Sequence, residues 1–131
     1  MATTDRWKAH RKLMADTMTH AFLSDVAGPQ MHRNALSMIK LWREKARLAQ
    51  GHPFTAVGDI KAAAMDIIWA ASFGTQMKVA ESQTKMLSNL DSIDLPADPK
   101  KEAVFPSAPN PEAFDAVINL SDSVSILFRL P

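Results

Sequence analysis

An indole and a guanidinium stand four residues apart near the start of the chain, at Trp7 and Arg11. The surrounding stretch has the character of a helix, in which each residue turns by about 100°, so the two side chains lie about 40° apart around the axis. An indole N–H beside a guanidinium fork forms a donor pair suited to a carboxylate or dianionic ligand. The alternative is structural, with Trp7 anchoring a core and Arg11 on its rim. The spacing alone leaves both interpretations open.

The other residues that could do chemistry do not combine into a site. The four histidines never occur at the four-residue spacing of helical metal ligands; they are His10, His20, His32 and His52. Asp59 and Asp66 stand about two helical turns apart. We expect Asp59, near the start of its helix, to interact favourably with the helix dipole. We expect Asp66 to need a hydrogen-bond or ion-pair partner if it is buried. No Gly-rich phosphate loop or Ser–His–Asp arrangement occurs, so we predict no catalytic residue and no metal site.

Composition indicates one globular unit without a strong electrostatic partner. The 131 residues are 47% hydrophobic and 22% charged, and the net charge of +1 gives no reason to expect nucleic-acid binding. The chain has no cysteine, which excludes disulfides, thiolate-bound zinc and a cysteine nucleophile within it. Residues 1–20 lack the apolar centre of a signal peptide, and no apolar run is long enough to cross a bilayer.

Hydrophobic periodicity predicts five helices and no confident strand, and hence an all-α fold. The predicted helices span residues 4–17, 29–50, 57–73, 78–90 and 112–129. Residues 92–111 contain five prolines and are typical of an irregular surface loop, which in a compact domain is often functional. We interpret residues 1–131 as a single partial domain.

The second and third predicted helices carry most of the apolar surface. The second begins at Gly28-Pro29 after a short connection, ends at Gly51, and has one apolar face at steps of three or four residues. That face consists of Met31, Ala35, Met38, Trp42, Ala46 and Ala49. The third helix, ending at Gly74, is apolar nearly all round, which is typical of a helix inside a larger structure. Trp42 and Trp69 are best interpreted as core residues.

The order of these segments resembles the cytochrome P-450 family of haem-thiolate monooxygenases, most of all its fungal microsomal members. Residues 5–22, with their W-x-x-x-R motif, resemble helix C. Residues 29–50 are similar to helix D, and residues 53–74, closing on Phe-Gly, are similar to helix E. The proline-rich loop and last helix fit the approach to helix F only in a general way. The resemblance covers roughly residues 4–75 well, and the fold it implies is a partial cytochrome P-450 fold, an incomplete helical fragment.

The resemblance also implies a cofactor and partners. In this family the Trp and Arg of helix C hydrogen-bond a haem propionate, so Trp7 and Arg11 are the expected haem contacts. The intact enzyme would insert one oxygen atom from O₂ into a small organic substrate, with electrons from NADPH delivered by a partner reductase at the cytoplasmic face of the endoplasmic reticulum membrane. Arg6, Lys8 and Lys12 would be docking candidates for the reductase. A solvated helix surface is the alternative for these three.

Part of the family pattern is missing from the chain. By the resemblance, the family's oxygen-activating helix, E-x-x-R pair and cysteine loop would follow Pro131, and without a cysteine the thiolate ligand of the iron cannot come from this polypeptide. We therefore expect a fragment of a monooxygenase that is inactive alone. The alternative is a freestanding all-α module that binds a protein partner through exposed apolar helix faces.

Overall fold

The computed structural model describes residues 5–15 and 19–127, and it is helical throughout its regular parts. No strand occurs among these described residues, which confirms the all-α prediction. The elements are α1 (Asp5–Met14), α2 (His20–Phe22), the π-helical turn η2 (Leu23–Ala27), α3 (Gly28–Ala49), α4 (Val57–Phe73), α5 (Val79–Ser88) and α6 (Glu112–Leu127). Both ends of the first predicted helix, residues 4–17, lie outside the described residues. The C-terminal end of the fifth, residues 112–129, also lies outside them.

The segment before α3 is helical, whereas the sequence suggested a connection around Phe22 and Leu23. A π-turn runs directly into α3, and the N–H of Gly28 bonds to the carbonyl of Leu23. Pro29 has no N–H to offer the carbonyl four residues earlier, and its ring would crowd an ordinary α-turn there. A widened π-turn accommodates the proline without ending the helix. Pro29 is therefore an early residue of a longer helical run and does not mark its start.

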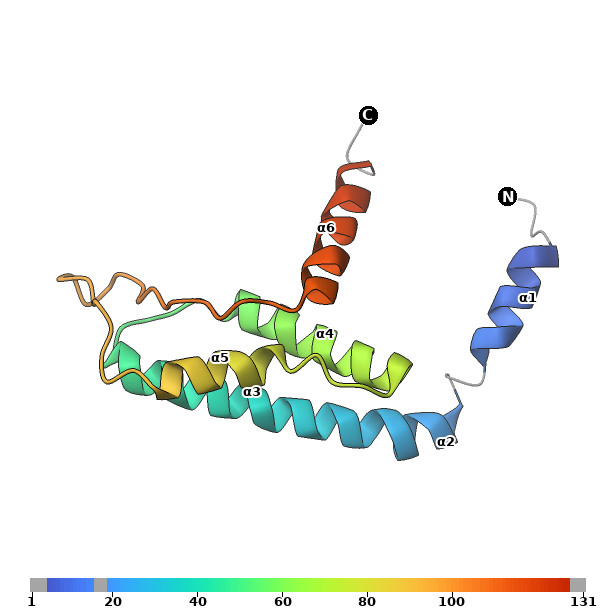
Figure 1. Cartoon of the computed structure of the whole chain (residues 1–131), viewed down its shortest axis with the longest axis horizontal. Helices are drawn as coiled ribbons and strands as arrows, with labels where there is room; N and C mark the ends of the chain where they lie inside the picture. The colour runs from blue at the N-terminus through green and yellow to red at the C-terminus, as the bar shows by residue number, and fades with distance from the viewer. Residues whose placement is uncertain (1–4, 16–18, 128–131) are drawn as a thin grey trace.

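Helix α3 is the longest element, and α4 and α5 pack alongside it (Figure 1). One core cluster lies between α3 and α5, and it contains Leu41, Leu48, Ala80 and Leu87. A second cluster joins α4 to the beginnings of α5 and α6, and it contains Ala62, Met77, Val79 and Phe114. The core is thus a thin layer shared by three helices.

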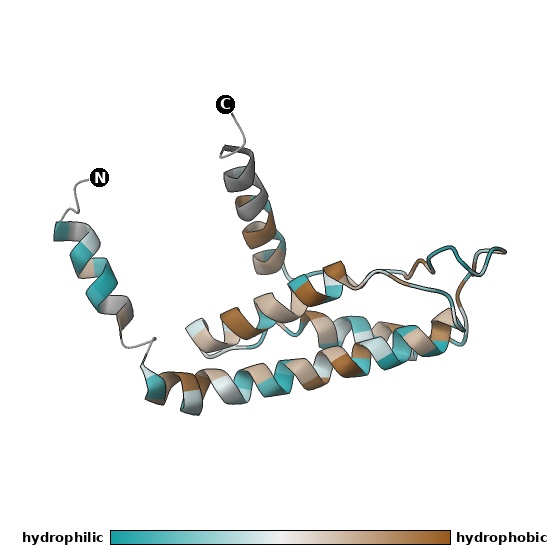
Figure 2. Cartoon of the chain, turned by 180° about the vertical axis from the view of Figure 1, so that it is seen from behind, coloured by the Kyte–Doolittle hydropathy of each residue, from teal (hydrophilic) through white to brown (hydrophobic). Residues whose placement is uncertain are grey.

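Helices α1 and α6 project from the same side of this layer, as both opposite views show (Figures 1 and 2). Among the side chains of α6 that the structure describes, Phe114 is 9% exposed and Ile118 packs against the same cluster, whereas Leu120 is 65% exposed. None of the described helices is both long enough and apolar enough to cross a bilayer.

The proline-rich loop is attached to the helical layer at defined points. The N–H of Ala103 donates to the carbonyl of Pro53 at 2.9 Å, and the Phe105 ring meets the Phe54 ring edge to face at 5.8 Å. Gln83 on α5 binds the loop twice, since its Nε2 donates to the Pro106 carbonyl and its Oε1 accepts from the Ala108 N–H, both at 2.7 Å. The loop therefore covers one end of the layer in a fixed position.

Candidate functional site

The two donors singled out in the sequence lie side by side on α1. The guanidinium carbon of Arg11 is 5.3 Å from the centroid of the Trp7 ring, which is the geometry of a cation–π contact. Trp7 is 49% exposed and Arg11 is also exposed. The structural alternative, in which Trp7 anchors a core, does not hold within the described residues.

The polar atoms of this pair are available to a ligand. Among the described residues, no hydrogen bond occupies the Trp7 indole N–H or the Arg11 guanidinium, and their contact with each other uses the ring face. A carboxylate placed beside them would accept from both donors, and charge-assisted bonds of this kind are the stronger ones in proteins. The donor chemistry therefore suits an acidic ligand group.

The basic residues around this pair that the structure describes are exposed on α1. Lys8 lies 3.9 Å from Asp5 in an exposed ion pair, and Lys12 and His10 are exposed along the same helix. The side chain of Arg6 lies outside what the structure describes. Exposed pairs of this kind contribute little to stability.

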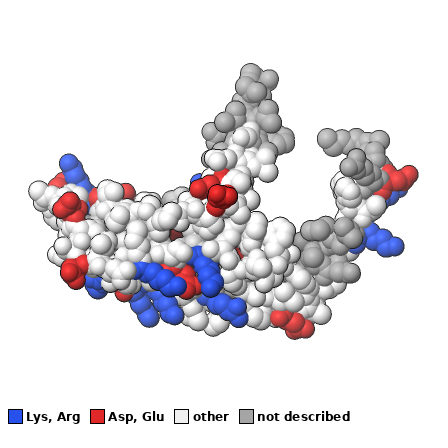
Figure 3. Space-filling view, viewed as in Figure 1, with Lys and Arg blue, Asp and Glu red and all other residues white. Residues whose placement is uncertain are grey.

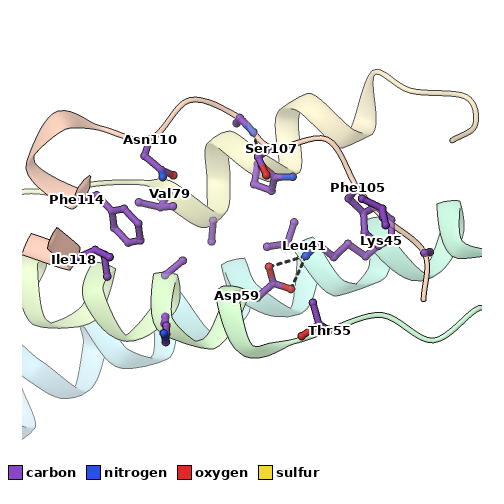
Figure 4. A pocket seen from close by; sticks show the side chains of 18 of the residues that line it. Leu41, Lys45, Thr55, Asp59, Val79, Phe105, Ser107, Asn110, Phe114 and Ile118 are labelled. Carbon is purple, nitrogen blue, oxygen red and sulfur yellow. Dashed lines mark hydrogen bonds and ion pairs between the residues drawn. The ribbon is translucent and has the colours of Figure 1, made fainter. Parts of the chain in front are cut away.

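A second candidate site is a cavity of about 480 Å³ between α3, α4, α5, the proline-rich loop and the start of α6. Figure 4 shows Val79, Phe114 and Ile118 together at one end of the cavity. Lys45, paired with Asp59, lies further along its wall, with Leu41 beside the pair. The sequence did not indicate this cavity, because its lining comes from five separate segments of the chain.

The charged wall of the cavity is a closed network. Lys45 Nζ lies 2.7 Å and 2.8 Å from the two carboxylate oxygens of Asp59, and the Trp42 indole N–H donates to Asp59 Oδ2 at 3.0 Å. Both charged residues are buried, and the rings of Phe54 and Phe105 lie within 5.9 Å and 5.3 Å of the ammonium. With both carboxylate oxygens engaged and the ammonium lying against two aromatic rings, this pair is suited to joining α3 to α4 and not to proton transfer.

Asp66 has the partner that the sequence could not name. Its carboxylate is 1% exposed and accepts hydrogen bonds from the backbone N–H groups of Val79 and Ala80, each at 3.3 Å. These are first-turn groups of α5, whose preceding residue Lys78 provides no side-chain cap. Burial raises the pKa of the Asp66 carboxyl, while the backbone hydrogen bonds lower it. Asp66 therefore serves as the cap of a neighbouring helix.

No metal site or acid–base pair assembles in the described part of the chain. Within it, no group of three His, Cys, Asp or Glu side chains is placed to hold a metal ion. The one histidine ring nitrogen with a hydrogen-bond partner there is Nδ1 of His52, 3.2 Å from the Lys101 carbonyl oxygen. Asp59 and Asp66 face different partners. The described residues thus contain an exposed donor pair on α1, and no catalytic constellation is assembled among them.

Comparison with known proteins identifies the class to which this portion belongs. A cytochrome P-450 monooxygenase of Pestalotiopsis microspora is 37% identical over 130 residues, which cover 99% of this chain and 22% of the relative. The cytochrome P-450 monooxygenase xilC of Penicillium crustosum is 32% identical over 130 residues, 98% of this chain and 23% of that protein. A third, from Fusarium sporotrichioides, is 36% identical over 84 residues. Neither a protein-family model nor a solved structure matches the chain.

The chain belongs to the cytochrome P-450 monooxygenase family. It spans less than a quarter of the length of the curated relatives that it matches along almost all of its residues. The agreement extends through the proline-rich loop and α6, where the sequence motifs gave only a general match.

Proposed function

We propose that this chain is the part of a haem-dependent monooxygenase in which Trp7 and Arg11 bind a propionate of the haem. The observation that carries the proposal is the exposed, side-by-side placement of these two donors on one face of α1. A charged hydrogen bond to a carboxylate contributes about 1.5–3 kcal/mol, and Arg keeps its charge in the dry surroundings of a cofactor. Membership of the family supplies the cofactor that such a pair would fit.

In the intact enzyme the haem supplies oxygen activation, so that one atom of O₂ enters a small organic substrate. The residues of this chain would position the cofactor through its acid groups and would not act on the substrate themselves. The chain contains no cysteine, so the thiolate ligand of the iron would come from polypeptide outside these 131 residues. We accordingly propose that the chain is inactive alone.

The electron supply follows from the same assignment. NADPH would reduce a partner reductase, and the exposed Lys8 and Lys12, with Arg6, would face the acidic surface of that partner from α1. The intact enzyme would work at the cytoplasmic face of the endoplasmic reticulum membrane. Electrostatic docking of this kind weakens as salt concentration rises.

A chimera tests the haem contact. This chain replaces the aligned segment of the Pestalotiopsis microspora monooxygenase, and the bound haem per polypeptide is measured in the purified protein. Trp7→Phe keeps an aromatic ring but removes the N–H donor, and Arg11→Ala removes the guanidinium. Each change should weaken haem retention by about tenfold, the effect of one lost charged hydrogen bond.

The matched control is His10→Ala, which alters an exposed side chain on the same helix. It should retain haem like the unmodified chimera. Equal haem retention in the Trp7 and Arg11 variants would refute the propionate assignment, while a chimera that folds but never takes up haem would refute the proposed function as a whole.

A further inference from the structure

The cavity between the helical layer and the proline-rich loop stays open although the loop is attached at several points around it. Gln83 of α5 binds the loop backbone at Pro106 and Ala108, and the Ala103 N–H donates to the Pro53 carbonyl. A volume of about 480 Å³ nevertheless remains beneath the loop. Packed protein interiors leave few voids larger than a water molecule, whereas small-molecule sites typically measure about 300–1,000 Å³. The cavity therefore has the dimensions of a ligand site.

The apolar part of the cavity lies at one end. Figure 4 shows Val79, Phe114 and Ile118 together there, and these residues belong to the second core cluster or pack against it. Further along the wall, Lys45 and Asp59 are already bonded to each other. An apolar ligand body is thus stabilised at the first end, and the ion pair offers no free charge at the second.

The ionisable side chains that line the cavity carry no net charge. They are two basic and two acidic residues, Lys45, Lys61, Asp59 and Glu102. The charged side chains on the face seen in Figure 3 gather instead over α3 and α5, where Glu81 lies among basic residues. An ionic ligand would lose its hydration in the cavity with no excess of opposite charge to compensate it. The lining therefore favours a neutral molecule.

The cavity also has polar groups that are available to a ligand. No hydrogen bond within the described residues engages the hydroxyls of Thr55 and Ser107. The Asn110 amide nitrogen donates to Asp115 Oδ1 at 2.9 Å, which leaves the amide oxygen of Asn110 available. Figure 4 shows Asn110 and Ser107 on the loop, with Thr55 across the cavity from them. Hydroxyls and an amide oxygen suit a ligand that carries hydroxyl or carbonyl groups.

We infer that this cavity binds a neutral, mostly apolar small molecule with one or two hydroxyl or carbonyl groups, and that the bound molecule ties the proline-rich loop to α4 and α5. The inference goes beyond the proposed function, because none of the lining residues lies on α1 and the binding needs no haem. The ion pair of Lys45 with Asp59 is engaged internally, so the lining holds the molecule and does not transform it.

The first experiment titrates the 131-residue chain, without haem, with the neutral fluorescent probe anthracenemethanol, substituted on its central ring. The unsubstituted chain should bind a single probe molecule with saturation. Gly58 lines the cavity and has open space where a Cβ would lie, so Gly58→Phe should fill part of the cavity and weaken binding by about tenfold. Ala62 lies one turn further along the same wall, and Ala62→Leu provides a second filling variant.

Two controls separate the cavity from the rest of the surface. Gly58→Ala adds a single methyl group and should leave the affinity unchanged. Ile60→Glu/Ile68→Glu alters the outer side of α4, where these residues are 52% and 60% exposed, and should also leave it unchanged. The inference would be overturned by a chain that shows no saturable binding, by binding that survives both filling variants, or by binding lost in an α4 double variant that keeps its helical signal.

A second experiment tests the polar part of the ligand class. Ethylanthracene, with its ethyl group at the same position, matches anthracenemethanol in size but has no hydroxyl. Ser107→Ala/Asn110→Ala should weaken binding of the alcohol by about fivefold, the effect of a neutral hydrogen bond, and should leave binding of the hydrocarbon unchanged. Ser82→Ala, on the exposed side of α5, should alter neither. Equal losses for both probes would overturn the assignment of hydroxyl-bearing ligands.

A third measurement follows the loop. Saturating anthracenemethanol should slow proteolysis within residues 103–110 several-fold in the unsubstituted chain and not in Gly58→Phe, because the bound molecule bridges the loop and the helices. Saturable binding without protection of the loop would place the probe elsewhere and overturn the inference. These measurements omit haem, so their failure leaves the proposed function standing, and a chimera that never takes up haem leaves the cavity site standing.

Discussion

Lys45 on α3 and Asp59 on α4 form a buried ion pair whose ammonium nitrogen lies 2.7 Å from one carboxylate oxygen and 2.8 Å from the other. The residues are 8% and 7% exposed, so neither charge is well hydrated. The Trp42 indole adds a third bond to the carboxylate. This network fixes the crossing of the two longest helices, and its stability depends on both partners being present.

Removing one partner of this pair should be strongly destabilising. Lys45→Met keeps the apolar stem but leaves the Asp59 carboxylate buried without its cation, which should lower the free energy of unfolding by about 3–5 kcal/mol. Lys45→Met/Asp59→Asn should be markedly less harmful, because no uncompensated charge remains. Urea unfolding of the two variants measures the difference.

An exposed ion pair of similar geometry provides the control. Lys85 lies 2.8 Å from Glu81 on the surface of α5, and Lys85→Met should cost less than about 1 kcal/mol. If Lys45→Met were no more damaging than Lys85→Met, the buried network would not hold α3 to α4.

The stability of the chain should depend on pH through Asp66. Burial raises the pKa of this carboxyl above its ordinary value of 3.8, so the folded chain holds the proton more tightly than the unfolded chain. The stabilising contribution is therefore complete below pH 3.8 and is lost as the pH rises through the raised pKa. As the pH increases over that window, the free energy of unfolding of the unsubstituted chain should fall relative to that of the Asp66→Asn variant.

This pH dependence is measured by urea unfolding of both proteins at several pH values. Asp66→Asn also weakens the cap of α5, since the amide offers one acceptor oxygen where the carboxylate offers two, so the prediction concerns how the difference between the two proteins changes with pH and not its size. The exposed Asp91→Asn serves as control. A constant difference between the parent and Asp66→Asn would contradict the prediction.

Two glycines of the α4 segment should respond oppositely to alanine. Gly74 ends α4 with a φ of +70°, a left-handed conformation that costs an L-residue about 1 kcal/mol or more, so Gly74→Ala should destabilise the chain. Gly58 lies in the first turn of α4 with open space around its Cα, so Gly58→Ala should stabilise it by about 0.5–1 kcal/mol. Thermal unfolding compares the pair, and shifts of the same sign would contradict these backbone assignments.

The proline-rich loop should become sensitive to proteases when Gln83 is altered. Gln83→Glu can still accept from the Ala108 N–H, but it cannot donate to the Pro106 carbonyl. A carboxylate oxygen of the variant would then face the Pro106 carbonyl oxygen. Because both are acceptors, they would repel each other and release this part of the loop from α5. Limited proteolysis should cut within residues 103–110 faster in the variant, while the helical signal stays unchanged. Ser82→Ala, on the exposed side of the same helix, should leave the cleavage rate unaltered.

Local sequence signals located the longer helices but not the helical segment before Gly28. The third helix was predicted at residues 57–73, and α4 spans Val57–Phe73, because Gly74 adopts the left-handed conformation that its type favours. The second was predicted at residues 29–50, and the α3 assignment ends at Ala49 because Gln50 already adopts a left-handed conformation. The π-turn before Gly28 was missed, since no residue type is specific for that geometry.

Periodicity alone predicted the inward face of α3 only in part. Ala49 is buried and Trp42 packs against the core, as the predicted stripe requires. The sequence suggested a stripe beginning at Met31, which is 50% exposed, whereas the buried residues include Asn34, Leu41 and Lys45. A lysine is a poor candidate for a core until its partner is known, and the partner Asp59 lies fourteen residues away on another helix. The cap of α5 by Asp66 was missed for the same reason. Contacts between separate helices were beyond what helical spacing predicts.

The Trp7–Arg11 pair was the part of the candidate site that the sequence could place. Residues four apart on one helix share a side whatever the rest of the molecule does, so the structure brings them together as the motif predicts. Their role toward haem stays a prediction, because it concerns a ligand and not the helix.

The ferrous carbon monoxide spectrum of the chimera with the Pestalotiopsis microspora relative tests the central claim most directly. By the proposed function, the host would supply the thiolate ligand of the iron, and this chain would supply Trp7 and Arg11. We predict the absorption band of thiolate-ligated haem in the unmodified chimera and a band reduced at least tenfold per polypeptide in Trp7→Phe/Arg11→Ala. A band of full intensity in the double variant would contradict the assignment of these residues to the haem.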